Sequence, residues 1–181
     1  DIKEKNNNIT ENKIVKNDNK LNNPKKNIVD NTSKPLKKIK DPVEALVDRE
    51  IFLPNYHKPI AYSDLNIKVT QKRHLPSPLN SAKIFQEANF TGKEVVLLIG
   101  ANYGYEAAIL SSMVETVIAI EEDIKLFNLG ERNIKNLNIE NLVFLNSKHN
   151  NGYKKLGLYD VIINIDLSFH INNELIDQLV N

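Results

Sequence analysis

Short apolar runs alternate with amphipathic stretches along most of the chain after residue 90. The runs Val95–Ile99 and Thr116–Ile120 are too short for buried helices, and they predict central parallel strands covered on both faces. Helical periodicity follows them at Tyr105–Leu110 and Ile124–Leu137. Because strands alternate with helices, the pattern predicts an α/β fold with a parallel sheet and right-handed crossovers.

The same pattern predicts further elements on either side of this core. Residues 54–80 hold four of the seven prolines, so this stretch should run as extended loop or edge structure over the surface. The other expected helices are Pro42–Arg49, Ser81–Ala88 and Ile171–Val180, and the other expected strands are Leu142–Leu145 and Tyr159–Ile165. Residues 41–181 therefore form one expected domain, with a helix and loop region over 41–90 and a core over 91–181.

The turn between the first strand and its helix carries the candidate chemistry. Gly100 and Gly104 bracket this turn, where glycine permits positive φ and a close approach of ligand, and the helix that follows offers free N–H groups. Asn102 stands where a full glycine pattern has glycine, and asparagine tolerates the left-handed region. Glu121 ends the second strand, where a carboxylate can accept hydrogen bonds from ribose hydroxyls. The layout indicates a nucleotide-cofactor site; the alternative is a plain βαβ turn beside a solvated acid.

The length and composition of the chain limit what the rest of the protein can be. The chain has 181 residues, 41% of them hydrophobic and 26% charged, enough for one globular domain and a tail. Residues 1–40 are rich in Asn and Lys and carry a net charge of +6, which leaves −5 on the remainder. They predict a disordered segment. Clustered lysines can bind nucleic acid, but without arginine or interleaved aromatics a solvated extension is favoured.

Several chemistries are excluded or disfavoured by the residue inventory. The chain has no cysteine, which excludes disulfides, thiolate metal sites and a cysteine nucleophile and is typical of a reducing cytoplasm. No apolar stretch reaches the length of a membrane span, so we expect no membrane association. The histidines His57, His74, His149 and His170 include no pair at metal-ligand spacing, so we expect no metal site.

Separate blocks between Arg49 and Val180 agree in order and spacing with a known family. They are Arg49, Glu50, Phe52 and Pro54; Ala61, Tyr62, Ser63 and Asp64; Pro78, Ala82 and Gln86; Gly100, Gly104, Tyr105, Ala107, Ala108 and Leu110; Val117, Ile120, Glu121 and Glu122; Gly152 and Tyr153; and Tyr159, Asp160 and Ile162. Across these blocks the chain resembles the protein L-isoaspartate (D-aspartate) O-methyltransferase family, whose members use S-adenosylmethionine to esterify abnormal aspartyl residues.

The resemblance implies a Rossmann-like S-adenosylmethionine-dependent methyltransferase fold, with a parallel sheet and helices on both faces. The cofactor-binding residues that it implies are Gly100, Asn102, Gly104, Tyr105 and Glu121. The glycine turn would approach the methionine part of S-adenosylmethionine, and the carboxylate would bind its ribose. The implied partner is a protein or peptide that contains isoaspartyl residues. The implied substrate loop is Leu65–Pro78, and within it His74 and Ser77 are the candidates for contact with the substrate carboxylate.

The chain departs from the family pattern at several positions. Pro76 replaces a serine of the substrate loop, and Ser77 beside it should point to the opposite face of an extended chain. Leu98 replaces an acid within the first core strand, and residues 147–149 replace an acid near the adenine. The family's sheet has three further strands, so an end at Asn181 would leave the fourth strand's flank uncovered. We therefore expect a truncated sequence or the product of a decayed gene.

Three functions from different classes remain open. The first is a methyltransferase that acts on isoaspartyl residues in damaged proteins. The second is a catalytically inactive remnant, or an interaction module, that keeps the fold without the chemistry. The third is an NAD-binding reductase domain, because Glu121 suits the ribose of NAD equally well.

Overall fold

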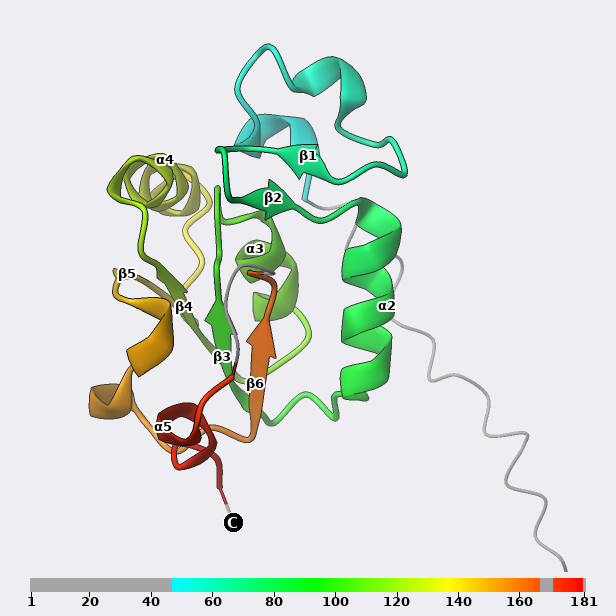
Figure 1. Ribbon diagram of the computed structural model, residues 1–181. Helices are drawn as coiled ribbons and strands as arrows, with labels where there is room; N and C mark the ends of the chain where they lie inside the picture. Colours follow the sequence, from blue (N-terminus) through cyan, green and yellow to red (C-terminus); the bar gives the residue numbers. More distant parts are fainter. Residues whose placement is uncertain (1–46, 167–170, 181) are drawn as a thin grey trace, which may run out of the picture. The chain divides into compact units, whose positions relative to one another are not determined.

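The computed structural model describes residues 47–166 and 171–180. At its centre is a parallel four-stranded sheet in the order β5-β4-β3-β6 (Figure 1). The strands are β3 (Val95–Ile99), β4 (Thr116–Glu121), β5 (Leu142–Asn146) and β6 (Val161–Asn164). Val95 pairs with Thr116, and Val96 pairs with both Val117 and Val161. The expected α/β fold with a parallel sheet is confirmed.

The strand order reverses direction at β3. From β3 the chain moves to β4 and then to β5 on one side, and it returns to β6 on the other side of β3. In open parallel sheets, ligands bind at such a switch point, in the crevice outside the carboxyl ends of the strands. The ends of β3, β4 and β6 are therefore the part of the fold where a site is expected.

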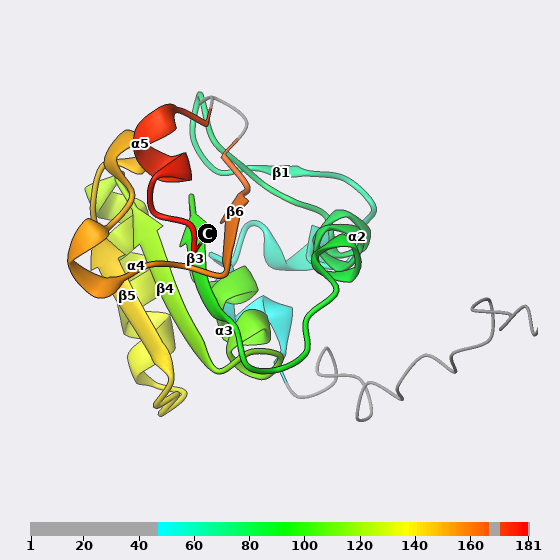
Figure 2. The same ribbon diagram turned by 90° about the horizontal axis from the view of Figure 1, so that it is seen from below.

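Helices cover both faces of the sheet, but unequally. They are α2 (Pro78–Ala88), α3 (Tyr105–Ser111), α4 (Ile124–Lys135) and α5 (Asn173–Ile176). Val96 and Leu98 of β3 face the larger hydrophobic cluster, which includes buried residues of α2, α3 and α4. Leu97 and Ile99 point the other way, into a smaller cluster with Leu175 of α5, because neighbours in a strand face opposite sides. Figure 2 shows α3 and α5 on opposite sides of β3.

Helix α2 begins at Pro78, three residues before the expected start. The Ser77 hydroxyl oxygen accepts a hydrogen bond from the Asn80 N–H at 3.3 Å, and proline at the first helical position needs no N–H partner. The helix ends at Asn89, which adopts the left-handed conformation with φ of 49°. Ser81 is the first buried residue of the helix, so the apolar pattern alone missed its first turn.

The segment after β6 is less helical than expected. A helix over Ile171–Val180 was predicted, but α5 ends at Ile176. Beyond α5 the backbone pairs with the residues before β6: the Tyr159 N–H donates to the Gln178 carbonyl at 2.7 Å, and the Val180 N–H donates to the Tyr159 carbonyl at 2.9 Å. This bridge takes backbone groups that a longer helix would have used, and it leaves β6 shorter than the predicted strand.

The described chain begins just before a single 3₁₀ turn, η2 (Arg49–Phe52), which Asp48 caps by accepting the Glu50 N–H at 2.9 Å. Most of the helix expected at 42–49 lies outside the described residues, as does the whole segment 1–40. The proline-rich stretch contains a 3₁₀ turn, η3 (Lys58–Ile60), and a hairpin of β1 (Ile67–Lys68) and β2 (His74–Leu75). Two further 3₁₀ turns follow β5: η4 (His149–Asn151) and η5 (Lys154–Leu156). Among the described residues, no helix has the length and apolar character needed to cross a bilayer.

Candidate functional site

The glycine turn after β3 meets the end of β4. Gly100, Asn102 and Gly104 have φ angles of 82°, 50° and 91°, all in the left-handed region that glycine and asparagine tolerate. The N–H groups of Gly100 and Ala101 both donate to the Ile120 carbonyl, at 3.0 and 3.1 Å. These bonds fix the turn against the neighbouring strand, so that its residues lie beside the last residue of β4.

Glu121 is that last residue, and its side chain is fully buried. Its carboxylate accepts four hydrogen bonds. Two come from the backbone N–H groups of Asn102 and Asp123, at 2.8 and 2.9 Å. The other two come from the guanidinium of Arg73, at 3.0 Å each, with one to each carboxylate oxygen. A buried carboxylate needs such partners, and here all four belong to the chain itself.

Arg73 comes from the β1–β2 hairpin, which lies across the ends of β3 and β6 in Figure 1. The residue is only 5% exposed. Besides binding Glu121, its Nη2 donates to Asn102 Oδ1 at 3.3 Å, and its Nε lies 3.5 Å from Asp166 Oδ1. The sequence pattern does not indicate Arg73, because 48 residues separate it from Glu121 and a single arginine in a loop has no periodic signal.

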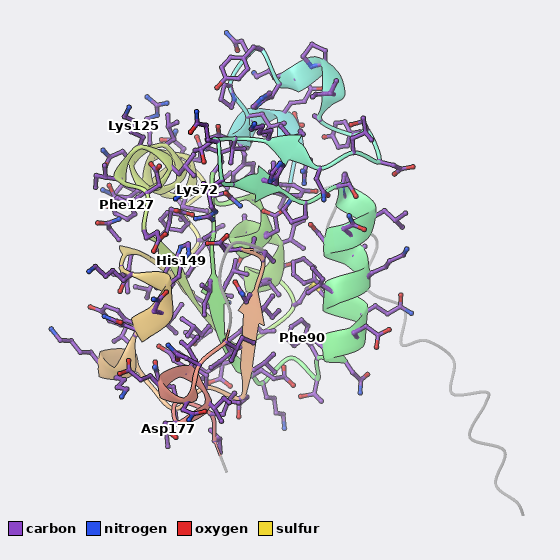
Figure 3. All side chains as sticks on the ribbon, in the orientation of Figure 1. Lys72, Phe90, Lys125, Phe127, His149 and Asp177 are labelled. Atoms are coloured by element: carbon purple, nitrogen blue, oxygen red, sulfur yellow. The ribbon has the colours of Figure 1, made fainter. Side chains whose placement is uncertain are left out.

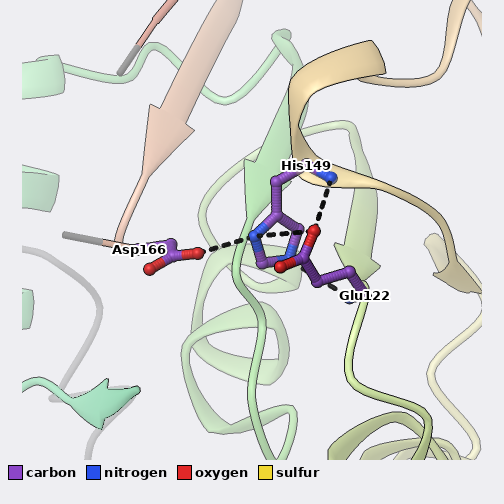
Figure 4. Close-up of side chains that lie close together, drawn as sticks. All are labelled: Glu122, His149 and Asp166. Atoms are coloured by element: carbon purple, nitrogen blue, oxygen red, sulfur yellow. Dashed lines mark hydrogen bonds and ion pairs between the residues drawn. The ribbon is translucent and has the colours of Figure 1, made fainter. Parts of the chain in front are cut away.

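A buried histidine completes the polar cluster at this end of the sheet. His149 Nδ1 lies 2.7 Å from Asp166 Oδ2, and its Nε2 accepts a hydrogen bond from the Glu122 N–H at 3.2 Å (Figure 4). These partners assign the ring proton to Nδ1. Asp166 follows β6 and Glu122 follows β4, so His149 links the ends of two strands that flank β3.

Glu122, His149 and Asp166 also form the one group of three metal-ligating side chains found within residues 47–166 and 171–180, with ligand atoms within 4.8 Å of one another. Spacing along the sequence could not reveal it, because each residue comes from a different segment. A metal ion would have to displace a hydrogen bond at either ring nitrogen, since Nδ1 donates and Nε2 accepts. The geometry therefore favours a hydrogen-bonded cluster at this position.

A second buried ion pair joins η2 to α3. Arg49 Nη1 is 3.5 Å from Glu106 Oε1, both side chains are fully buried, and the Ser81 hydroxyl donates to the same carboxylate oxygen at 3.1 Å. Burial raises the pKa of Glu106, although Arg49 acts in the opposite direction. The Arg49 guanidinium also lies 4.5 Å from the centre of the Tyr105 ring. Of the predicted cofactor residues, Tyr105 thus packs in the interior. Gly100, Asn102 and Gly104 form the turn, and Glu121 is bonded to it through the Asn102 N–H.

Comparison with known proteins assigns the family. Residues 21–181 match the family described as protein-L-isoaspartate(D-aspartate) O-methyltransferase. The chain belongs to this family. It is 31% identical over 133 residues to protein-L-isoaspartate O-methyltransferase from Helicobacter pylori strain G27, a match that covers 74% of this chain and 64% of the relative. The protein of the same name from Dictyoglomus turgidum is 30% identical, with 74% and 60% covered.

Solved structures agree with this family and fold. A structure named protein-L-isoaspartate O-methyltransferase superposes with a TM-score of 0.68 at 25% identity, over 76% of this chain and 46% of that one. Precorrin-6y C5,15-methyltransferase from Geobacter metallireducens superposes with a TM-score of 0.52 at 16% identity, which shows the fold alone. The expected Rossmann-like methyltransferase fold is confirmed. The matched region spans less than two thirds of the H. pylori G27 and D. turgidum relatives.

Within this methyltransferase-family fold, the substrate-loop candidates lie in different settings. His74 is exposed on β2, and its backbone carbonyl accepts a hydrogen bond from Asn102 Nδ2 at 3.4 Å. Ser77 is 1% exposed, and its hydroxyl oxygen caps α2. The carbonyl of Pro76 accepts a hydrogen bond from Arg49 Nη2. The loop is therefore bound to the domain by its backbone and by the helix cap, and of the two candidates only the His74 side chain is exposed.

The groups at the turn are of the type that S-adenosylmethionine requires. Gly100 offers backbone without a Cβ, and Glu121 offers two acceptor oxygens. In the described conformation the space in front of Gly100 holds other side chains, since a Cβ there would lie 2.9 Å from both Arg73 Nη2 and Asp166 Cβ.

Beside this filled space lies an open cavity of about 510 Å³, lined by Thr70, Gln71, Lys72, Arg73, Glu122, Asp123 and Lys148. Figure 3 shows Lys72 and His149 at this end of the sheet. The cavity and the glycine turn are thus separated by Arg73.

Proposed function

We propose that this chain binds S-adenosylmethionine at the carboxyl ends of β3 and β4 and transfers its methyl group to the free carboxylate of isoaspartyl residues in damaged proteins. One observation carries the proposal: in a chain of this family, the left-handed turn Gly100–Gly104 adjoins the fully buried carboxylate of Glu121. Gly100, Asn102 and Gly104 would line the cofactor, and Glu121 would bind its ribose. The support comes from family membership, the turn geometry and the position of the carboxylate.

The proposed methyl transfer needs no acid or base from the protein. The cofactor supplies a methyl group on a sulfonium; the sulfur–carbon bond breaks with its electron pair left on sulfur, and an oxygen–carbon bond forms with the substrate carboxylate. No proton is transferred, so the residues of the site need only bind, align and exclude water. His74 lies on β2, next to the turn through its backbone contact with Asn102, and its exposed side chain would meet the substrate carboxylate.

Substitution of the carboxylate tests the cofactor assignment. Glu121→Gln removes the charge that would accept the ribose hydroxyls, and we expect it to weaken S-adenosylmethionine binding by about tenfold or more in calorimetric titration. Glu131→Gln on α4 is the matched control, because its side chain is 38% exposed. Circular dichroism confirms that each variant is folded. Unchanged affinity in Glu121→Gln would contradict the assignment, and saturable NADH binding without S-adenosylmethionine binding would favour the reductase alternative.

A second candidate function is a protein that keeps the fold without turnover. Two observations favour it: the Ser77 hydroxyl is occupied by the α2 cap, and Glu121 is fully paired with groups of its own chain. Transfer of labelled methyl groups decides between the two. Methylation of an isoaspartyl peptide, but not of the matching aspartyl peptide, supports the enzyme. Cofactor binding with no labelled peptide supports the inactive form.

A further inference from the structure

The Arg73 guanidinium fills the two positions on Glu121 that a ribose needs. Nη1 donates to Oε1 and Nη2 donates to Oε2, both at 3.0 Å. A vicinal diol donates to a carboxylate in the same way, with one hydroxyl on each oxygen. The remaining acceptor positions are taken by the backbone N–H groups of Asn102 and Asp123, which belong to the turn and to the start of α4. Arg73 and a ribose therefore cannot bind Glu121 together.

Arg73 also fills the volume beside the glycine turn. A Cβ on Gly100 would lie 2.9 Å from Arg73 Nη2, so the guanidinium is packed directly against the turn. Its Nε lies 3.5 Å from Asp166 Oδ1, which gives it two buried carboxylates as partners. A cofactor that approached the backbone of Gly100 would meet this side chain first.

The hairpin that carries Arg73 has strands of two residues each, and it is anchored by Ile67 and Leu75, which are buried in the larger hydrophobic cluster. A change in the position of Arg73 therefore concerns its side chain and not the anchored strands. The turn is closed by local bonds: the Val69 N–H donates to the Arg73 carbonyl at 3.0 Å, and the Arg73 N–H donates to Thr70 Oγ1 at 3.1 Å. Because these bonds lie within the hairpin, they can be kept while the guanidinium leaves Glu121.

The open cavity offers the guanidinium another place. Glu122 and Asp123 line it together with Arg73, and the side chain of Glu122 is 46% exposed. Lys72 and Lys148 line the cavity as well and balance the two acidic side chains, so a guanidinium that left Glu121 would be compensated there mainly by solvent. The proposal requires this second arrangement of Arg73, in the open cavity.

We propose that Arg73 is an internal competitor for the cofactor: its guanidinium occupies the carboxylate of Glu121 and must leave it before the ribose of S-adenosylmethionine can bind there. This inference rests on the proposed function of the site. Cofactor affinity is then set by how often Arg73 leaves Glu121, since a site that is open for only a fraction of the time binds more weakly by that fraction.

Removal of the competing side chain tests the inference. Arg73→Ala should tighten S-adenosylmethionine binding by about tenfold or more in calorimetric titration, and Arg73→Gln, with a single neutral donor group, should give a smaller gain. Arg132→Ala is the matched control, because Arg132 is exposed on α4. Adenosine should gain as S-adenosylmethionine does, whereas 2′,3′-dideoxyadenosine, which lacks the diol, should gain little. Thermal denaturation of each variant verifies folding.

The outcomes separate this inference from the cofactor assignment. Tighter binding in both Arg73 variants, with Arg132→Ala unchanged, supports the competition. Equal affinity in the parent chain and in the folded Arg73 variants, together with weaker binding in Glu121→Gln, overturns the inference and leaves the proposed function standing. If no folded variant binds S-adenosylmethionine, both fail. If Arg73→Ala does not fold, the affinity of Arg73→Gln relative to the parent chain decides.

Discussion

Arg49 and Arg73 each place a guanidinium against a fully buried carboxylate, on Glu106 and Glu121. Removal of one partner from such a pair costs more than the pair itself contributes, because a buried charge is left without compensation. Both arginines come from the segment before α2, and both carboxylates follow β3 in the chain. These long-range pairs therefore attach the substrate-loop region to the sheet.

Arg49→Met should destabilise the protein by about 3 to 5 kcal/mol, because it leaves Glu106 buried without its counter-charge. The double substitution Arg49→Met with Glu106→Gln should recover most of this loss, since no buried charge remains. The pKa of Glu106 is already raised by burial, so the loss in Arg49→Met should shrink as the pH falls and the carboxyl takes up a proton. Urea unfolding at pH 5 and pH 8 measures both effects; a double variant no more stable than the single one would contradict the explanation.

The individual residues of the site were only partly predictable from the sequence. Asn102 and Glu121 followed from the spacing of a glycine turn and the strand after it, because that motif is local. Arg73, His149 and Asp166 did not, since their partners are defined by the meeting of separate segments. His149 is 17 residues from Asp166 and 27 from Glu122, distances that no local pattern encodes.

The core elements were predictable because their hydrophobic periods are strong. Strands β3 and β4 and helices α3 and α4 lie within one or two residues of their expected bounds. The end of α2 at Ala88 was also predicted, but its start and the bounds of α5 were not, because a polar cap decides the first and backbone pairing beyond α5 affects the second. One helix contact also has no sequence signal: a Cβ on Gly130 of α4 would lie 2.6 Å from the Phe144 ring and 2.9 Å from the Asn102 carbonyl. Glycine there lets α4 approach both β5 and the turn.

The cap of α2 gives a test of what Ser77 does. Ser77→Ala removes the oxygen that accepts the Asn80 N–H, and we expect a loss of about 1 kcal/mol in the free energy of unfolding. Ser77→Thr keeps an oxygen at this position and should lose less. Urea unfolding measures the stability, and methyl transfer measured on the same samples gives the contrast. A loss of transfer with no loss of stability would instead indicate that Ser77 contacts the substrate.

The stability of the entire domain should respond to pH through the loop before β3. The backbone of Glu94 accepts hydrogen bonds from the N–H groups of Glu115 and Thr116, which join the starts of β3 and β4. Its carboxylate is partly buried, which acts against ionisation, but hydrogen bonds from the Thr91 hydroxyl and from the N–H groups of Thr91 and Gly92 lower its pKa to about 2 from an ordinary 4.5. The ionised carboxylate therefore holds the loop that positions the central strand.

Glu94→Gln should lower the thermal midpoint at neutral pH, and the difference from the parent chain should vanish as the pH falls toward 2. The sign follows from the lowered pKa: the carboxylate contributes stability above its unfolded pKa near 4.5, and that contribution is lost as the pH falls through the folded value. Thermal unfolding followed by circular dichroism between pH 2 and pH 7 measures it, with Glu131→Gln as the control. A midpoint difference independent of pH would contradict this account.

The pairing of Arg73 with Glu121 has a consequence for the lifetime of the protein. A ligand that binds only the folded state stabilises it by an amount that grows with the logarithm of the ligand concentration, so a protein whose buried charge is neutralised only by a ligand loses stability when that ligand is scarce. Here the chain supplies its own counter-ion, and the folded state needs no help from a small molecule to neutralise that carboxylate. The cofactor-free protein should accordingly stay folded and resist proteolysis when S-adenosylmethionine is scarce, and bound cofactor adds to this stability.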